Sequence, residues 1–317
     1  EPTTIGLDLY REFPTSSEFP KLKDWLQSDR FFTLCKVRDR ELEEPAIPVH
    51  PEISRGRESF VGFSDVIEDR DGVIRRHLLS MTPQDNICNA HNAFSLLIAL
   101  HYLHSKKKNF EILSDTGELQ IEETVLRKIP SHSGVYQLPD AQGYQMPLNY
   151  RSYPSPEEIV QQVSISEAIE YNNTSPNLFK DKIVLIGVTS SRIRNFWETP
   201  YSRGQPRNKR TITGVFLQAH MISQIISAVL DNRPLIRMAT WWEDALLLLL
   251  ASSCGILLGW YRDWKENVFL GPASLFVLGL LCYKLLGLGI WVAFLPSAFA
   301  VITSMTLLSL YKQVFER

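Results

Sequence analysis

The chain has 317 residues, a formal net charge of −2 at pH 7 and 44% hydrophobic residues. This near-neutral balance excludes nucleic acid as an expected partner, because binding to phosphate needs a concentrated basic face. The length allows about two units of roughly 150 residues each. The sequence begins at Glu1 and carries no signal peptide, so we expect it to be a piece of a longer chain.

Strand-like and helix-like runs alternate through the first 238 residues. In chain order we predict strands at 3–10 and 31–38 around a helix at 21–28, strands at 59–66 and 72–81, a helix at 86–108, short strands at 119–121 and 146–150, a helix at 165–171, a strand at 182–187 and a helix at 214–235. The strand at 182–187, KIVLIG, is fully apolar and is interpreted as the central one. The pattern favours an α/β fold with a mostly parallel sheet and helices on both faces.

The loop after KIVLIG has the position of a nucleotide site but lacks its glycines. Gly187 is followed by VTSSRIRNFW, without a G-x-G-x-x-G or G-x-x-x-x-G-K-[ST] pattern. Close approach of the backbone to a phosphate needs those glycines. We therefore expect no nucleotide and no other cofactor.

The last third of the chain is largely apolar. Three runs have the length and the aromatic ends of membrane-spanning helices, at about residues 242–261, 267–283 and 286–311. A buried helical hairpin in a soluble protein is the alternative, and three such runs in succession argue against it. Glu243 and Asp244 are interpreted as interfacial acids near a helix N-terminus rather than functional intramembrane acids. Gly287, Gly289 and Pro296 permit close packing or a kink in the last run.

Positive charge gives a weak signal for the orientation of these runs. The first connection carries Arg262 and Lys265, and the tail carries Lys312 and Arg317. Cytoplasmic loops are rich in Lys and Arg, which places both segments in the cytoplasm and the polar region outside. Arg233 and Arg237 stand on the wrong side for this rule.

Five segments of the chain, in order, match one family pattern. They are IGLDLYREFP, FVGFSDVIEDRDGVIRRHLL, MPLNYRS, FKDKIVLIGVTSSRIRNFWETPYS and TGVFLQAHMISQII. With three membrane helices directly after them, they resemble the type-two CHASE domain, an extracellular sensory module of bacterial membrane receptors. The resemblance covers essentially the whole chain. It departs at Asn195, where family members often carry an acidic residue, and at Ala219 and His220, whose usual order is reversed.

The resemblance implies a sensor domain over residues 1–238, lacking the family's first strand and helix. It implies transmembrane helices over 239–311 and a cytoplasmic tail or output linker over 312–317, in a bacterial inner membrane. An output unit, typically a kinase or a nucleotide cyclase, would stand outside these residues, so the chain itself is not expected to be an enzyme. Its partners would be the lipid bilayer, an unknown ligand or protein, and the output unit. Transmembrane relays commonly work in pairs, so a homodimer is a candidate assembly.

Ligands of parallel sheets tend to bind beyond the carboxyl ends of the strands. This rule locates candidate ligand-binding residues without any motif. Arg75 is added because the side chains of Arg75 and Arg76 point to opposite faces of a strand, so that one of them could face a ligand carboxylate or phosphate. The candidates are Asp8, Arg11, Lys36, Arg38, Thr189, Ser190 and Ser191, with Arg75 and Asn195. Ordinary loop polarity is the alternative for each.

Three aspartates lie close together in the segment FSDVIEDRDG. Asp65, Asp69 and Asp71 are weak candidates for a calcium site, because hard cations prefer several carboxylates. The twelve-residue calcium loop with its closing Glu is missing. We favour a hairpin turn in which the glycine after Asp71 supplies a positive φ, with Arg75 or Arg76 paired to one of these acids.

Cysteine and histidine pairs leave alternatives open. Cys35 and Cys88 could form a disulfide in an oxidising compartment, but two cysteines are no disulfide framework. His101 and His104 share a helix face and could bind a metal with a third ligand, although solvent exposure beside a lysine run is favoured. His220 is interpreted as a hydrogen-bonded core residue.

Three functions compete at this stage. The first is a sensor that passes a ligand or assembly signal through the last helix to a partner. The second is a membrane-anchored scaffold that docks a protein and binds no small ligand. The third is a hydrolase using Asp8, Asp69 or Asp71 with a metal, which is disfavoured because these carboxylates lack metal-ligand spacing.

Overall fold

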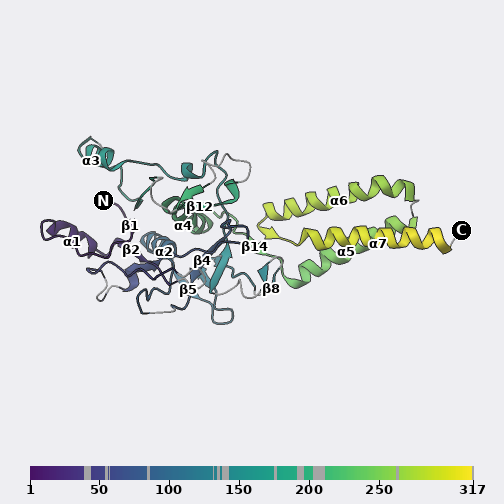
Figure 1. Cartoon of the computed structure of the whole chain (residues 1–317), viewed down its shortest axis with the longest axis horizontal. Helices are drawn as coiled ribbons and strands as arrows, with labels where there is room; N and C mark the ends of the chain where they lie inside the picture. Colours follow the sequence, from purple (N-terminus) through teal and green to yellow (C-terminus); the bar gives the residue numbers. More distant parts are fainter. Residues whose placement is uncertain are drawn as a thin grey trace. The chain divides into compact units, whose positions relative to one another are not determined.

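The structure, a computed structural model, covers most of the chain. The residues it describes are 1–38, 44–53, 56, 58–83, 86–130, 132–133, 136–137, 143–174, 177–190, 196–202, 211–261 and 264–315. The chain divides into two compact units (Figure 1). Unit 1 comprises Glu1–Lys128 with Gln142–Leu235, and unit 2 comprises Ile129–Ala141 with Ile236–Arg317.

A four-stranded parallel sheet forms the frame of unit 1. Its order is β11 (Ile183–Gly187), β1 (Thr4–Asp8), β2 (Phe31–Cys35) and β3 (Val61–Phe63). Every neighbouring pair is parallel, and β1 pairs with β11 along its whole length. The predicted α/β class, with a parallel sheet followed by membrane-length helices, is confirmed.

The prediction that KIVLIG is the central strand is wrong. β11 lies at an edge of the described sheet, and β1 and β2 lie inside it. All five side chains of β2 are buried, whereas Ile186 on β11 is 38% exposed. An apolar strand is packed on its faces, but its composition does not tell whether it has a neighbour on both sides.

Three helices pack around this sheet. α2 (Phe94–Ser105) contacts β1, β2 and β3, and α4 (Gly214–Leu230) contacts β11 and α2. α1 (Pro20–Leu26) connects β1 to β2 and buries Leu26 in the core. These contacts arise because the helices bring apolar side chains to an apolar sheet surface, which is the main source of their stability.

Two glycines set the distance between α2 and the sheet. A Cβ atom on Gly62 would lie 2.3 Å from the Cα of Phe94, a backbone atom. A Cβ atom on Gly6 would lie 2.5 Å from Cδ1 of Ile98, the far end of a side chain. Glycine is therefore required at both positions for α2 to lie where it does, and more strictly at Gly62.

Smaller antiparallel sheets complete unit 1. The first pairs β4 (Arg76–Ser80) with β10 (Tyr144–Pro147). The second contains β5 (Phe110–Ile112), β6 (Leu119–Ile121) and β7 (Thr124–Leu126), and the third pairs β12 (Phe196–Glu198) with β13 (Thr211–Thr213). Unit 1 also contains the helix α3 (Ile165–Thr174) and short helical turns at Glu58–Phe60, Pro156–Ile159 and Pro200–Ser202.

The helix predicted over 86–108 begins only at Phe94. The residues before it pair with the end of β4, where the Ala93 N–H donates to the Leu79 carbonyl at 2.8 Å.

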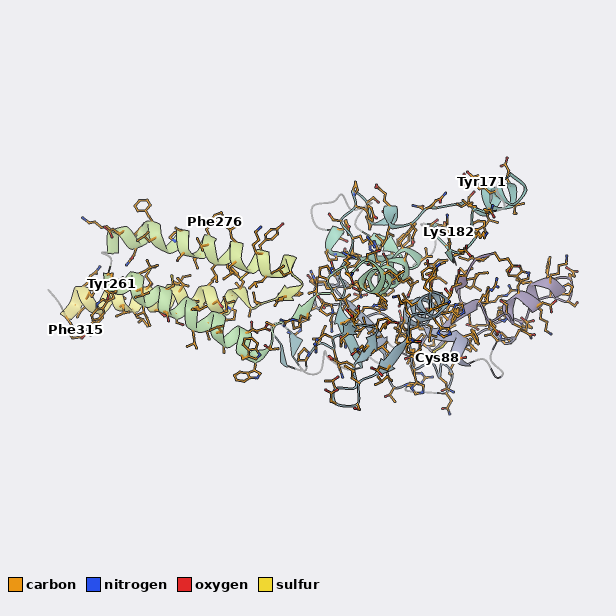
Figure 2. The ribbon with its side chains drawn as sticks, turned by 180° about the vertical axis from the view of Figure 1, so that it is seen from behind. Cys88, Tyr171, Lys182, Tyr261, Phe276 and Phe315 are labelled. Carbon is orange, nitrogen blue, oxygen red and sulfur yellow. A yellow bond between two sulfur atoms is a disulfide. The ribbon has the colours of Figure 1, made fainter. Side chains whose placement is uncertain are left out.

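Unit 2 contains three long apolar helices. α5 (Trp241–Tyr261), α6 (Trp264–Gly287) and α7 (Phe294–Phe315) are each long and apolar enough to cross a membrane. Large apolar side chains stand on their surfaces, such as Phe276 on α6, which is 68% exposed (Figure 2). Such surfaces suit contact with lipid.

The third of these helices begins later than predicted. α6 continues to Gly287 and closes in a turn, in which the Gly289 N–H donates to the Leu286 carbonyl and Gly289 has a φ of +83°. β15 (Ile290–Trp291) follows and pairs in parallel with β14 (Arg237–Met238). Gly289 therefore makes a turn, and no atom lies within 4 Å of a Cβ placed on Gly287.

Unit 2 contains another pair of short strands besides β14 and β15. β8 (His132–Ser133) pairs with β9 (Tyr136–Gln137) in an antiparallel arrangement.

The most extensive helix contact in unit 2 joins α5 and α7. A Cβ atom on Gly255 would lie 2.5 Å from the Val301 carbonyl oxygen, and one on Gly259 would lie 2.8 Å from the Cβ of Leu308. Small residues four positions apart let the backbones of membrane helices approach closely. Close packing is therefore carried by these two glycines of α5 and not by the glycines at the end of α6.

Candidate functional site

The four parallel strands of unit 1 end together at one border of the sheet, which we call the carboxyl edge. β1 ends at Asp8, β2 at Cys35, β3 at Phe63 and β11 at Gly187. Ligands of α/β folds tend to bind at this border. The predicted candidates that the sheet brings to it are Asp8, Lys36, Thr189 and Ser190, and the structure adds Tyr10, Ser64 and Asp65.

Asp8 occupies an unusual environment at the carboxyl edge. Thr4, Gly6 and Asp8 alternate along β1 and so point to one face of the sheet. α2 covers that face, because the Thr4 hydroxyl lies 2.8 Å from His101 Nδ1 and Gly6 lies against Phe94. Asp8 therefore lies toward the end of α2 that begins at Phe94. Within the described residues its Oδ2 is buried without a hydrogen-bond partner, and burial raises the pKa of Asp8 to about 7.

Hydrogen bonds join the strand ends beside Asp8. The Tyr10 hydroxyl donates to Ser64 Oγ at 2.5 Å, and the Ser64 hydroxyl donates in turn to the Cys35 carbonyl at 3.2 Å. Asp65 Oδ2 accepts the Val37 N–H at 3.0 Å. Burial raises the pKa of Tyr10 to about 12, so its hydroxyl remains a donor at neutral pH.

The predicted cations near this edge differ in their surroundings. Lys36 forms an ion pair with Glu44, so its charge is already balanced within the fold. Arg11 is exposed to solvent. Two further candidates, Ser191 and Asn195, lie outside the described residues.

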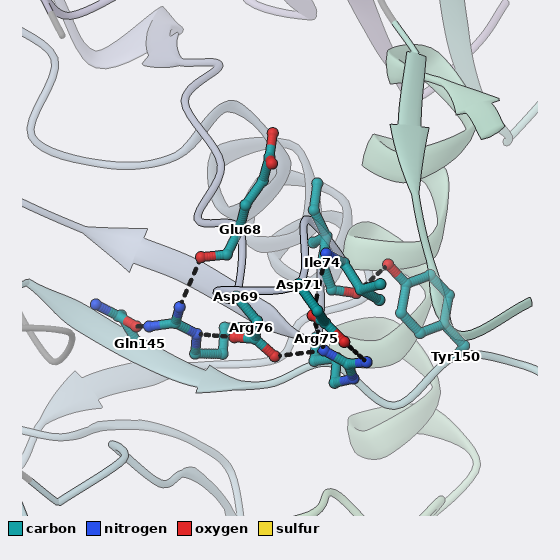
Figure 3. Close-up of polar contacts among 9 residues, drawn as sticks. Glu68, Asp69, Asp71, Ile74, Arg75, Arg76, Gln145 and Tyr150 are labelled. Carbon is teal, nitrogen blue, oxygen red and sulfur yellow. Dashed lines mark hydrogen bonds and ion pairs between the residues drawn. The ribbon is translucent and has the colours of Figure 1, made fainter. Parts of the chain in front are cut away.

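The segment containing Asp69 and Asp71 forms the predicted turn (Figure 3). Gly72 has a φ of +75°, and its N–H donates to the Asp69 carbonyl at 2.8 Å. Arg75 donates to one oxygen of Asp69 and to both oxygens of Asp71, each at 2.8 Å. Arg76 Nε donates to the other oxygen of Asp69 at 2.8 Å. Both arginines therefore pair with Asp69, and the contact of Arg75 with a ligand stays a prediction.

The residues considered for metal binding each contact a different part of unit 1. Asp65 accepts a backbone N–H at the carboxyl edge, and Asp69 is held by two arginines. His101 lies against the Thr4 hydroxyl. Within the described part of the chain, no group of three His, Cys, Asp or Glu side chains could hold a metal ion.

Comparison with known protein families identifies the group to which these features belong. A family model described as the CHASE2 domain matches residues 1–257. This chain belongs to the CHASE2 domain family. CHASE2 domains are sensory and extracellular, which agrees with the resemblance drawn from the five sequence segments. No curated protein and no solved structure matches the chain.

A disulfide ties the carboxyl edge of this CHASE2 domain to the segment before α2. Cys35, at the end of β2, is bonded to Cys88 across 53 positions of the chain, with their Cα atoms 5.6 Å apart (Figure 2). The sequence left this pairing open, and the structure shows it. Closing a loop of this length restricts the unfolded chain and is worth about 4 kcal/mol in the entropic description.

The core of the CHASE2 domain holds a polar network that sequence inspection missed. His77 has no exposed surface, its Nε2 lies 2.8 Å from Ser95 Oγ, and its Nδ1 lies 3.1 Å from Gln224 Nε2. An amide nitrogen only donates, so Nδ1 accepts and Nε2 carries the proton. Gln224 Oε1 accepts the Asn149 N–H at 2.9 Å, which connects β4, α2, α4 and the segment after β10. The core encloses this serine–histidine pair, so it offers no nucleophile to a substrate.

Acidification should destabilise the CHASE2 domain through His77. Burial lowers the pKa of His77 from 6.5 to about 3, so the unfolded chain binds a proton that the folded chain rejects. The contribution of His77 to the free energy of unfolding should fall by about 1.4 kcal/mol per pH unit as the pH drops below about 6.5. The raised pKa of Asp8 acts in the opposite direction over this range, so the slope of His77 is obtained by comparing variants. Burial also lowers the pKa of His220, to about 4, which adds to the slope.

Urea unfolding of the detergent-solubilised chain between pH 7 and pH 5 measures this slope. His77→Gln should flatten the profile, because glutamine binds no proton in either state. His104 is exposed, and His104→Gln should leave the profile as it is. Equal slopes in all three proteins would contradict the assignment.

Removing the charge of Asp69 should destabilise the domain strongly. Arg76 is only 4% exposed and keeps its Nη contacts to Gln145 Oε1 and the Glu68 carbonyl, but Asp69→Asn removes the carboxylate that pairs with its buried charge. Breaking a buried ion pair from one side costs about 3 kcal/mol. Asp71→Asn is the control, because Asp71 is exposed and forms its ion pair with Arg75 at the surface. Thermal midpoints of both variants check this, and equal shifts would argue against a structural role for the Asp69–Arg76 pair.

Proposed function

We propose that this chain is the sensory part of a bacterial transmembrane receptor. Unit 1 binds a ligand outside the cytoplasm at the carboxyl edge, and three helices cross the inner membrane and relay the signal to a cytoplasmic output unit. The observation that supports this proposal most strongly is that a chain of an extracellular sensory domain family ends in three helices of membrane length. The disulfide supports the outer location, because disulfides persist in oxidising compartments.

Contacts at the start of unit 2 support a relay that ends on α7. β14 follows unit 1 in the chain and pairs with β15, which precedes α7. Arg237 on β14 donates to both oxygens of Glu243 at 2.7 Å, and Asp244 accepts the Ala293 N–H at the start of α7 at 3.1 Å. A displacement of β14 would therefore reach α7 directly. A ligand produces such a displacement only if it binds one of two states better.

The pairing of Arg237 also removes a conflict in the predicted orientation. This residue stands on the side where the charge rule expects few cations. Its bidentate pair with Glu243 balances its charge beside the start of α5. The orientation with unit 1 outside then agrees with the charges of the first connection and the tail, whereas Arg233 and Lys284 still stand on the outer side.

In this proposal the chain binds and relays but does not catalyse. Its serine–histidine pair is enclosed in the core, and its turn aspartates are held by arginines. The enzymatic output, a kinase or a cyclase, would be a separate unit. Turnover by the purified chain on any phosphorylated or ester substrate would argue against this.

A protein-docking scaffold is the second candidate, and α3 favours it. Ile165 and Ile169 stand one turn apart on this helix and are 76% and 67% exposed. Exposed apolar side chains in a row mark interaction surfaces. A partner captured by the wild type and lost with Ile165→Glu and Ile169→Glu, in the absence of any small ligand, would favour the scaffold.

Cysteine labelling in living cells tests the proposed topology. Glu123 in unit 1 and Gln313 in α7 are both exposed and suit single cysteine substitutions. A membrane-impermeant maleimide should label Glu123→Cys in intact cells and Gln313→Cys only after lysis, because three spans separate the two positions. Serine at Cys254 and Cys282 removes the free thiols. Labelling of both positions on one side, or the reverse pattern, would contradict the receptor topology.

A further inference from the structure

The strongest unexplained feature of the molecule is the unpaired carboxyl group of Asp8. Its Oδ2 is buried and, within the described residues, accepts no hydrogen bond. Burying a charged group is costly unless a partner compensates it, and buried polar atoms are nearly always paired. Asp8 as a whole is only half-buried, so the strand end that carries the enclosed carboxyl oxygen borders on solvent.

The charges around Asp8 show which kind of partner is missing. Asp65 follows β3 and Glu44 lies by Lys36, which it neutralises. Arg38 is exposed and has a contact of its own. Among the described groups at the strand ends, Lys36 is paired with Glu44, and Asp8 carries a buried carboxyl oxygen that accepts no hydrogen bond. Tyr10, an aromatic side chain that is 44% exposed, lies two positions beyond Asp8.

We propose that the carboxyl edge binds a small molecule through a protonated amine, which pairs with the Asp8 carboxylate beside the ring of Tyr10. This rests on the proposed sensory function and names the chemical class of the ligand. An ammonium group supplies the positive charge and up to three donors that Asp8 lacks. An aromatic ring next to the carboxylate adds to the binding of such a cation. A carboxylate or phosphate ligand would meet like charge, and a hydroxyl would leave the charge of Asp8 uncompensated.

The environment of Asp8 permits it to gain charge when the amine binds. Asp8 lies toward the N-terminal end of α2, which favours an anion. The first turns of α2 and α4 carry no titratable side chain. The other titratable or charged groups described at the carboxyl edge are Tyr10, Asp65, Arg11, Arg38 and the Lys36–Glu44 pair. Tyr10 remains neutral throughout the physiological range, so we expect binding to follow the ionisation of Asp8.

This linkage gives the binding a defined pH dependence. The pKa of Asp8 is raised to about 7 by burial, so the carboxylate form is fully available only above that pH. The affinity for an amine should be near its maximum at pH 8 and about tenfold lower at pH 6. An amine that bound elsewhere on the surface would show no such change, because its own charge is constant in this range.

The unliganded protein carries a second signature of the same site. A carboxyl group whose folded pKa is above its unfolded value loses stability as the pH rises through both values. Asp8→Asn removes this ionisation and should raise the thermal midpoint of the unliganded chain at pH 8, relative to the wild type. At pH 5 the difference should be smaller, and it should disappear only below about pH 3.8, where Asp8 is protonated in the folded and in the unfolded chain.

A thermal-shift experiment on the detergent-purified full chain tests the proposal. The probes are propane-1,3-diamine, propane-1,3-diol and malonate, which match in size and differ in charge, at concentrations up to about 50 mM, since small fragments bind weakly. The diamine should raise the midpoint of unit 1 at pH 8 and much less at pH 6, and the diol and malonate should not. The shift should vanish in Asp8→Asn and persist in Asp24→Asn, a neutralised exposed aspartate on α1.

Three results would overturn the amine assignment. The first is a shift by malonate or the diol equal to that by the diamine, and the second is a diamine shift that survives in Asp8→Asn. The third is the absence of any diamine shift at pH 8 up to the highest concentration, whatever the midpoint of Asp8→Asn. The sensory function is judged separately, because cysteine labelling reports the topology whether or not an amine binds.

Discussion

Gly62→Val should destabilise unit 1 by about 3 kcal/mol or more. The new Cβ would lie 2.3 Å from the Cα and 2.4 Å from the N of Phe94, so the backbone of α2 itself would have to move. α2 covers three strands of the parallel sheet, and a shift of its first turn would open the core beside the carboxyl edge. Substitution at Gly62 should therefore weaken both the fold and the candidate site.

Thermal and urea unfolding of the detergent-solubilised chain measure this effect. Gly6→Ala is the matched comparison, because its Cβ would meet the flexible ends of Ile98, Phe94 and Leu185 side chains. These ends can move by rotation, so Gly6→Ala should lower the midpoint less than Gly62→Ala, and Gly62→Val most of all. If Gly62→Ala were as stable as the wild type, α2 would not lie this close to β3.

Gly255→Leu should separate α5 from α7 and abolish their close packing. A side chain at this position would collide with the Val301 carbonyl and with Ser304, both on α7. Membrane helices have no hydrophobic force holding them together, so they depend on this backbone contact. We expect the loss of about 2 kcal/mol or more of bundle stability, since backbone atoms cannot rotate away.

Gly287→Leu is the control for this substitution, because no atom lies within 4 Å of a Cβ at that position. The thermal midpoint of helix loss, followed by far-ultraviolet circular dichroism in one detergent, compares the two leucine variants. Gly255→Leu should melt well below the wild type and Gly287→Leu close to it. Similar melting of the two variants would show that Gly255 does not carry the contact.

The fold class could be predicted because apolar strands and helices alternate visibly along the first 238 residues. The place of β11 in the sheet could not, since KIVLIG is apolar whether it lies inside or at an edge. The start of α2 was misjudged for a related reason. Residues before Phe94 have a helical pattern, but the Ala93 N–H is bonded to β4, a partner far away in the sequence.

The candidate site was predicted in part. The rule for parallel sheets placed Asp8, Lys36 and Thr189 at the same border, because it needs only the ends of the strands. The pairing of Lys36 with Glu44 and the sharing of Asp69 by two arginines depend on side-chain geometry, which no local pattern contains. The contact between α5 and α7 was also missed, but it could have been predicted, because Gly255 and Gly259 stand four positions apart in the sequence.

The buried polar network was not readable. His77, Ser95 and Gln224 come from three elements that are distant in the chain, and each looks ordinary in its own segment. The disulfide could not be predicted with certainty for the same reason, because two cysteines in a sequence can pair only if the fold brings them together. Long-range contacts of this kind are set by packing of the whole unit.

Hydrogen exchange on the full chain in lipid nanodiscs, with and without propane-1,3-diamine at pH 8, tests most directly whether binding at the carboxyl edge is relayed to α7. We predict slower exchange in β1 and β11, together with altered exchange in β14, β15 and the first turn of α7, and neither change in Asp8→Asn. A change confined to β1 and β11, with β14, β15 and α7 exchanging as in the unliganded protein, would contradict the relay.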